Sequence, residues 1–111
     1  MELVAELNQM IDAFDEVAFQ RYKGVEGWVD LNESQSFGWH KLKRGWRLVY
    51  ENRETNKIEP LRRAPVPVRV EAGIQLPELI KVLDANLALN NQRTHLAVEN
   101  LREAVYALRG E

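Results

Sequence analysis

The side chains with the clearest potential for chemistry are the basic residues in the middle of the chain. Residues 37–70 carry nine basic and three acidic side chains, a net charge of +6, whereas residues 1–36 carry two and eight, and residues 71–111 carry four and six. Basic side chains interleaved with aromatic rings are typical of proteins that hold phosphates with Lys and Arg and stack bases on rings. We take seven of these residues as candidate partner-binding residues: His40, Lys43, Arg44, Arg47, Arg62, Arg63 and Arg69.

Three interpretations of this basic region are open. It neutralises the acidic residues 1–36 or is a solvated face, it binds a protein with an acidic surface, or it binds nucleic acid. The chain contains no RNP-type string of glycine and aromatic residues, and the rings that would stack on bases are also the ones needed for a core. As a function we therefore expect a protein partner with an acidic surface, with nucleic acid as the alternative.

Two other pairs of side chains have the spacing of neighbours on a helix. His95 and Glu99 could share a metal ion, but a zinc or iron site needs at least one more ligand. Asp12 and Glu16 could act as acid and base, although acidic helix faces are common. The segment 24–27 lacks the lysine of a phosphate-binding loop, and no Gly-x-Ser-x-Gly motif occurs. We expect no enzymatic activity, no catalytic residue, no metal site and no cofactor.

The length and composition fit a single domain over residues 1–111. The chain is 45% hydrophobic and 29% charged, which is enough for one core. It has no cysteine, so disulfides and thiolate metal sites are excluded. No basic segment followed by an apolar run opens the chain, and no run of about 18 apolar residues occurs. We expect a small cytoplasmic interaction or regulatory module that does not enter a membrane.

A β-hairpin at residues 37–50 must position most of the basic side chains. Period-two alternation gathers the large apolar side chains on one face of each of its strands. These side chains are Phe37, Trp39, Trp46, Leu48 and Tyr50. If they form a buried face, Trp46→Ala should cost about 3 to 5 kcal/mol of stability and His40→Ala little.

The loop length decides whether the two sets of rings share a face. A four-residue loop from Leu42 to Gly45, with Gly45 at positive φ, pairs Trp39 with Leu48 and keeps the rings together. A two-residue loop would require positive φ of Arg44, and a three-residue loop would turn Trp39 to the other face. We expect the four-residue loop. The opposite face, with Gly38, His40, Arg47 and Val49, is then expected to be solvated or used for binding.

The segments that flank the hairpin predict helices and short strands. Apolar residues recur every three or four positions over residues 3–17, which predicts an amphipathic helix that ends near residue 23, before Gly24. Residues 28–31 and 58–61 are predicted as short strands. Residues 66–70 alternate valine with other residues and suggest an edge strand, but a helix from Pro67 onward is also open.

The last element is predicted as a helix over residues 78–109. An apolar stripe with alternating spacings of four and three runs through it. Its members are Leu76, Ile80, Leu83, Leu87, Asn90, Thr94, Ala97, Leu101, Ala104 and Leu108. A straight helix of this length spans about 48 Å, but a compact chain of this size is roughly 35 Å across.

Two arrangements resolve this mismatch. Either the helix breaks near residues 90–92 into a helical hairpin, or its exposed half pairs with a second chain. In a homodimer, Asn90 would lie in the seam, where a partner asparagine could satisfy it. We favour the homodimer, because a hairpin there would lack a glycine. The expected fold class is α+β: an N-terminal helix, an antiparallel sheet of three to four strands centred on hairpin 37–50, and a long C-terminal helix or helical hairpin.

Overall fold

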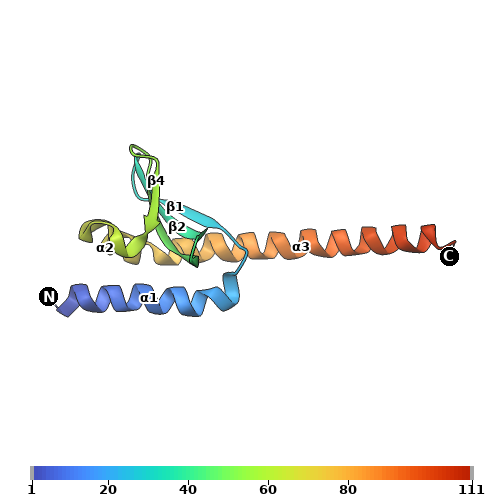
Figure 1. The fold of residues 1–111 in the computed structure, drawn as a ribbon, viewed down its shortest axis with the longest axis horizontal. Helices are drawn as coiled ribbons and strands as arrows, with labels where there is room; N and C mark the ends of the chain where they lie inside the picture. The colour runs from blue at the N-terminus through green and yellow to red at the C-terminus, as the bar shows by residue number, and fades with distance from the viewer. Residues whose placement is uncertain (1, 111) are drawn as a thin grey trace.

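The protein folds into a helical layer packed on a sheet, as a computed structural model of residues 2–110 shows (Figure 1). The sheet is antiparallel and has the strand order β1-β2-β3-β4. In chain order the elements are α1 (Glu2–Tyr22), β1 (Gly27–Asp30), β2 (Gln35–Leu42), β3 (Gly45–Asn52), β4 (Lys57–Pro60), the short 3-10 helix η1 (Leu61–Arg63), α2 (Val66–Ile74) and α3 (Leu76–Leu108). The predicted α+β class is confirmed, and so are the short strands expected at residues 28–31 and 58–61.

The β2–β3 hairpin has the register that the four-residue loop predicts. Trp39 lies opposite Leu48, as expected, but the pairing extends to Leu42 and Gly45. The loop is therefore the two-residue turn Lys43–Arg44 and not the expected four residues from Leu42 to Gly45. Gly45 has a φ of 120°, a conformation that L side chains rarely adopt. A glycine at this position therefore fixes which residues share a face.

All three helices pack on the face of the sheet that carries the rings. Phe37 and Trp39 are completely buried there, α1 lies over β3, and α3 lies over β1. Helix α3 approaches the sheet closely because Gly27 of β1 has no side chain: a Cβ there would lie 2.8 Å from a methyl group of Leu83. The buried core consists mainly of Ile11, Ala18, Tyr22, Val25, Phe37, Trp39, Leu48, Tyr50, Leu61, Val68, Ala72, Leu79 and Leu83.

Helix α1 is confirmed, but its buried face is narrower than the apolar pattern suggests. Ile11, Ala18 and Tyr22 are buried, whereas Leu3 and Val17 are largely exposed. The helix ends at Tyr22, and Gly24 follows with a φ of 84°, as expected for a glycine stop.

The opposite face of the hairpin is not solvated as expected. Val49 is completely buried. Trp28 of β1 lies over Gly38, where a Cβ would be 2.7 Å from the indole ring. At Gly38 and Val49 the expectation of a solvated face was wrong, because β1 brings a tryptophan to their cross-strand row.

Two glycines that are not at positive φ should respond to alanine in opposite ways. At Gly38 a Cβ would lie 2.3 Å from the carbonyl oxygen of Gly27. Gly38→Ala is therefore expected to lower the free energy of unfolding by about 2 to 3 kcal/mol. At Gly73 in α2 the nearest neighbour would be a Leu7 methyl at 3.8 Å. Gly73→Ala is expected to raise stability by about 0.5 to 1 kcal/mol through helix propensity. Urea denaturation followed by circular dichroism measures both, and a destabilised Gly73→Ala would contradict this packing.

Residues 66–74 form a helix, so the edge strand suggested by the alternating valines was wrong. Pro67 lies in the first turn of α2, where a missing N–H costs nothing. Val68 and Ala72, four residues apart, face the core, and Val66, Val70 and Ile74 form an exposed row on the other side. Spacings of four in both rows show that the alternation belongs to a helix.

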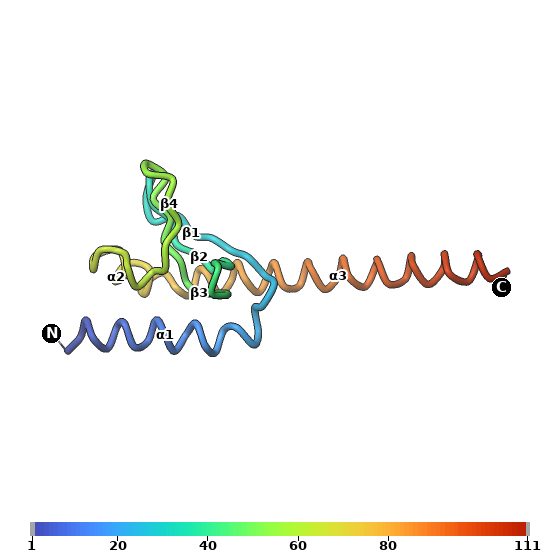
Figure 2. Tube along the Cα trace, viewed as in Figure 1, coloured from blue at the N-terminus to red at the C-terminus, as the bar shows by residue number. Residues whose placement is uncertain are grey.

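Helix α3 is a single unbroken helix that projects far beyond the rest of the chain (Figure 2). The molecule measures 69 × 29 × 25 Å, with a radius of gyration of 18.3 Å, well above the roughly 13 Å of a compact chain of this length. Every residue from Ala88 to Gly110 is exposed. The break near residues 90–92 that was held open is absent within the described chain. Residues 88–108 are called the overhang below.

Candidate functional site

The basic side chains nearest the hairpin turn form a concave basic pocket. It has a volume of about 240 Å³ and is lined by Leu42, Lys43, Arg44, Arg47, Pro60 and Arg63. The turn between β2 and β3 supplies Lys43 and Arg44, β3 supplies Arg47, and η1 supplies Arg63. The tight hairpin and the adjacent β4–η1 corner thus bring together cations that are 20 positions apart in sequence.

The cations of the basic pocket form no ion pair within the described residues, although Asp12, Asp15 and Glu16 of α1 line a neighbouring cleft together with Arg44 and Arg47. Within residues 2–110, Lys43, Arg44, Arg47 and Arg63 are absent from every ion pair that forms. The Nε atom of Arg47 is buried without a hydrogen-bond partner, which is costly for a charged group. Four like charges in one concavity repel one another, so a bound anionic group would stabilise this arrangement.

The other three predicted partner-binding residues have internal roles instead. Arg62 pairs with Asp12 of α1 at 2.8 Å, and Arg69 donates a hydrogen bond to Asn8 of α1. His40 donates from Nδ1 to the carboxylate of Glu26. The seven residues therefore do not form one surface. Arg62 pairs with an acidic side chain of the first helix, as the neutralisation interpretation expects, whereas Arg69 bonds to the neutral side chain of Asn8.

The aromatic rings are largely unable to stack on bases. Phe37, Trp39 and Tyr50 are buried beneath the helices. Trp46 is half-buried and stacks on Trp39, with ring centroids 6.3 Å apart. Among the described residues, the rings of Phe19 and Tyr106 are exposed and those of Trp28 and Trp46 are partly exposed. Of these, Phe19 and Trp46 lie close to the basic pocket, since they share a neighbouring cleft with Arg44 and Arg47.

Asp15 is a functional group that the sequence reasoning missed. Its carboxylate accepts a hydrogen bond from the backbone N–H of Leu48 at 2.7 Å and thereby fastens α1 to β3. Burial raises the pKa of Asp15 from 3.8 to about 6, against the opposing effects of the Leu48 N–H and the nearby charge of Arg47. A signal was present, because Asp15 continues the spacing of the buried residues Ile11, Ala18 and Tyr22.

The raised pKa of Asp15 predicts a pH-dependent stability. The folded state holds the carboxyl proton of Asp15 more tightly than the unfolded state does. The contribution of this group to the free energy of unfolding is therefore fully present below pH 3.8 and is lost as the pH rises through about 6. Asp15→Asn keeps an acceptor for Leu48 without a charge. After allowance for solvent screening, it should raise the free energy of unfolding at pH 7.5 by about 1 to 2 kcal/mol.

Urea denaturation of wild type and Asp15→Asn at pH 4 and pH 7.5 measures this effect. The other carboxyl groups contribute equally to both proteins, so they do not affect the difference between the two free energies of unfolding. Glu16→Gln is the matched control, since Glu16 is the exposed neighbour on the same helix, and it should change stability little at either pH. An equal difference between wild type and Asp15→Asn at the two pH values would refute the assignment.

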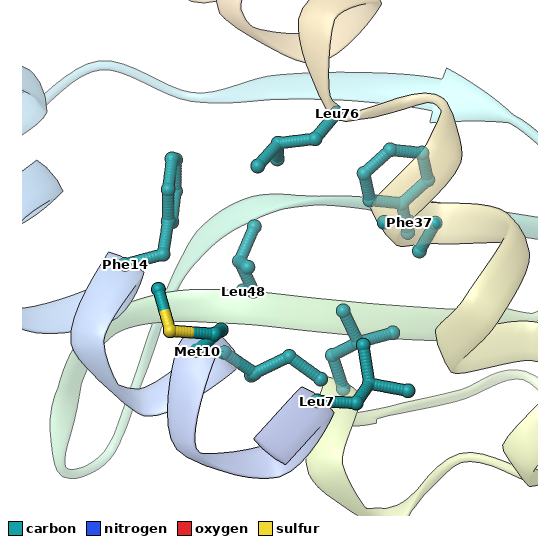
Figure 3. Close-up of a pocket in the computed structure, with 10 residues that line it drawn as sticks. Leu7, Met10, Phe14, Phe37, Leu48 and Leu76 are labelled. Atoms are coloured by element: carbon teal, nitrogen blue, oxygen red, sulfur yellow. The ribbon is translucent and has the colours of Figure 1, made fainter. Parts of the chain in front are cut away.

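An apolar cavity of about 190 Å³ lies between α1 and the sheet (Figure 3). Leu7, Met10 and Phe14 of α1 form one wall, and Phe37 and Leu48 of the sheet lie across from them. All of the residues around it are apolar, so the cavity can accept an apolar group but has no side chain to orient a polar one.

The overhang exposes more large apolar side chains than any other part of the described chain. These are Leu89, Leu96, Val98, Leu101, Val105, Tyr106 and Leu108. Its two candidate metal ligands, His95 and Glu99, form a surface pair at 3.2 Å, and residues 2–110 contain no group of three His, Cys, Asp or Glu side chains placed to hold a metal ion.

Together these features describe an α+β domain with a basic pocket at one corner and a projecting apolar helix. Comparison with protein-family models, with curated proteins and with solved structures finds no significant match. In the part of the chain that the structure describes, no helix has both the length and the apolar character needed to cross a membrane.

Proposed function

We propose that the chain is a small non-enzymatic interaction module that forms a homodimer through the overhang of α3 and engages a protein partner with an acidic surface through the basic pocket. The overhang is the observation that carries the proposal. It extends α3 by about 32 Å and makes no packing contact with the domain, since all its residues are exposed.

An isolated helix of this kind is marginal in water. Helical segments of roughly 20 residues gain most of their stability from packing of an amphipathic face rather than from propensity. The overhang carries such a face: Val98, Leu101, Val105 and Leu108 recur at spacings of three and four, as in the seam of a coiled coil. A partner helix would supply the packing that the domain itself does not.

The dimer is tested by multi-angle light scattering of the full chain over a concentration series. We expect twice the 12.9 kDa chain mass at tens of micromolar. A monomer throughout this range would contradict the proposal. The cytoplasmic location and the lack of enzymatic activity stay predictions from the sequence.

The second candidate ligand of the basic pocket is a nucleic acid. This candidate is favoured by the four cations of the pocket, which form no ion pair within residues 2–110. Binding to phosphates releases counterions, so it must weaken steeply with salt. Because the rings of Phe37, Trp39 and Tyr50 in the hairpin are buried and the chain is acidic overall, we expect no measurable binding to random single-stranded or duplex oligonucleotides at physiological salt, measured by fluorescence anisotropy.

The decisive variant reverses the pocket charges: Lys43, Arg44 and Arg47 are all changed to Glu. The control is Lys57→Glu, an exposed lysine at the start of β4 outside the pocket. If wild type binds oligonucleotides at micromolar concentrations, and the charge reversal removes binding while the control does not, the basic pocket binds nucleic acid and the proposal of a protein partner fails.

A further inference from the structure

The apolar stripe of α3 keeps one face from the domain to the end of the overhang. Leu87, Thr94, Leu101 and Leu108 are spaced by seven, and a straight helix drifts only about 20° per heptad. Leu87 packs against the domain core. The overhang therefore presents its apolar seam on the side of α3 where the domain itself lies.

This shared face excludes a parallel pair of α3 helices. In a parallel pair, each residue of the seam faces its own counterpart, and the contact continues toward the N-terminus. Leu83 and Leu79, one and two turns before Leu87, are already completely buried, and Leu83 lies against Gly27 of the chain's own sheet. Two domains would then have to occupy the same space between the helices.

We infer that the overhang pairs with the overhang of a second copy in antiparallel orientation, so that the two domains lie at opposite ends of the dimer. This inference rests on the proposed function, which requires the dimer. Helix α3 extends past the domain only on its C-terminal side (Figure 1), so an antiparallel partner brings its own domain in beyond the C-terminus, where the first chain leaves space.

The register follows from where the domain ends. In an antiparallel seam with valines and leucines at alternating positions, Val98 faces Leu101 of the second copy, Thr94 faces Val105, and Asn91 faces Leu108. A shift by one heptad toward the domain would place Leu108 against Asp84, which is occupied because it accepts hydrogen bonds from Tyr22 at 2.7 Å and from Arg21. The longest overlap that the domain permits therefore ends at Asn91.

The surface that this register covers is an apolar patch of a size that is often functional. Val98, Leu101, Val105 and Leu108 have 46%, 65%, 40% and 89% of their surface exposed. That amounts to roughly 400 Å² of apolar surface on each chain, the size at which a patch marks an interaction site. Ala97, Ala104 and the stems of flanking side chains add to this contact on both chains. The alanines lie along one edge of the seam, where small side chains let the helices approach.

Disulfide trapping tests the orientation, because the native chain has no cysteine. The full-length variants Asn91→Cys and Leu108→Cys are oxidised separately and as a mixture, and peptide mapping identifies the linked residues. Only thiols with close Cβ atoms can bridge without backbone movement. We expect disulfide-linked dimers in the mixture alone, with residue 91 joined to residue 108.

Each other result has a distinct meaning. Disulfides within each single variant, 91 to 91 and 108 to 108, would show a parallel dimer and overturn the orientation while the proposed dimer stands. A dimer by light scattering without any of these disulfides would overturn the register, and a larger assembly would overturn the two-helix seam. If wild type and both variants are monomers by light scattering, the proposed function itself fails.

Discussion

Trp39→Ala is expected to lower the free energy of unfolding by about 3 to 5 kcal/mol, a large part of the stability of a small domain. Trp39 is completely buried, and the ring of Phe14 from α1 meets it edge-on at 6.0 Å. Its Nε1–H donates a hydrogen bond to the carbonyl oxygen of Tyr22 at 3.1 Å. The substitution therefore opens a cavity and also removes one of the hydrogen bonds that the Tyr22 carbonyl accepts, leaving the one from the backbone N–H of Val25.

Two other variants calibrate this effect under the same urea denaturation. Trp46 was expected from the sequence to be as costly, but it is only half-buried, so Trp46→Ala should cost about 2 kcal/mol. His40→Ala removes one partly exposed hydrogen bond to Glu26 and should cost less than about 1 kcal/mol. If Trp39→Ala and His40→Ala have similar denaturation midpoints, the assignment of the buried face is wrong.

The hairpin was predictable because its register depends on local chemistry. In a short basic turn flanked by alternating apolar residues, the single glycine favours the register that keeps the rings together and places positive φ at Gly45. What covers each face of the hairpin, however, depends on the other elements of the fold. That Trp28 would cover Gly38 and Val49 follows from the pairing of β1 with β2, and no pattern within residues 37–50 contains this information.

The segment 66–74 shows why the valine pattern was ambiguous. Alternation at positions 66, 68 and 70 fits a strand, whereas burial at Val68 and Ala72 fits a helix. Three residues are too few to separate a period of 2 from one of 3.6. The packing of α2 against α1 and the core decides the outcome, and this tertiary term overrides the β propensity of valine.

The candidate partner-binding residues were found by composition. Composition could not show which of them bond to other side chains of the chain and which do not. Lys43 and Arg63 form no ion pair within residues 2–110, whereas Arg62, adjacent in sequence to Arg63, pairs with Asp12. Adjacent residues of a 3-10 turn point in different directions, so which of the two reaches α1 is a property of the folded chain. The long apolar stripe was predictable as a helix for the opposite reason, since its period is regular over its whole length.

Leu101→Asp is expected to convert the proposed dimer to a monomer and to leave the domain folded. Leu101 has 65% of its surface exposed within one chain, so the aspartate meets water there and costs the domain little. In the dimer, Leu101 lies in the apolar seam, where two chains would each bury an unpaired carboxylate. We expect the free energy of dimerisation to weaken by at least about 3 kcal/mol, which corresponds to a rise in the Kd of the dimer of more than about 100-fold.

The monomer should also lose helix, since the overhang depends on its partner for packing. Circular dichroism should therefore show a lower helical content for Leu101→Asp, with the near-ultraviolet signal of the buried tryptophans unchanged. Leu96→Asp is the matched control, because Leu96 is similarly exposed at 57% but lies five residues earlier, about 140° around the helix from Leu101. If Leu96→Asp dissociates the dimer and Leu101→Asp does not, the seam lies on the other face of α3 and the pairing argued above is wrong.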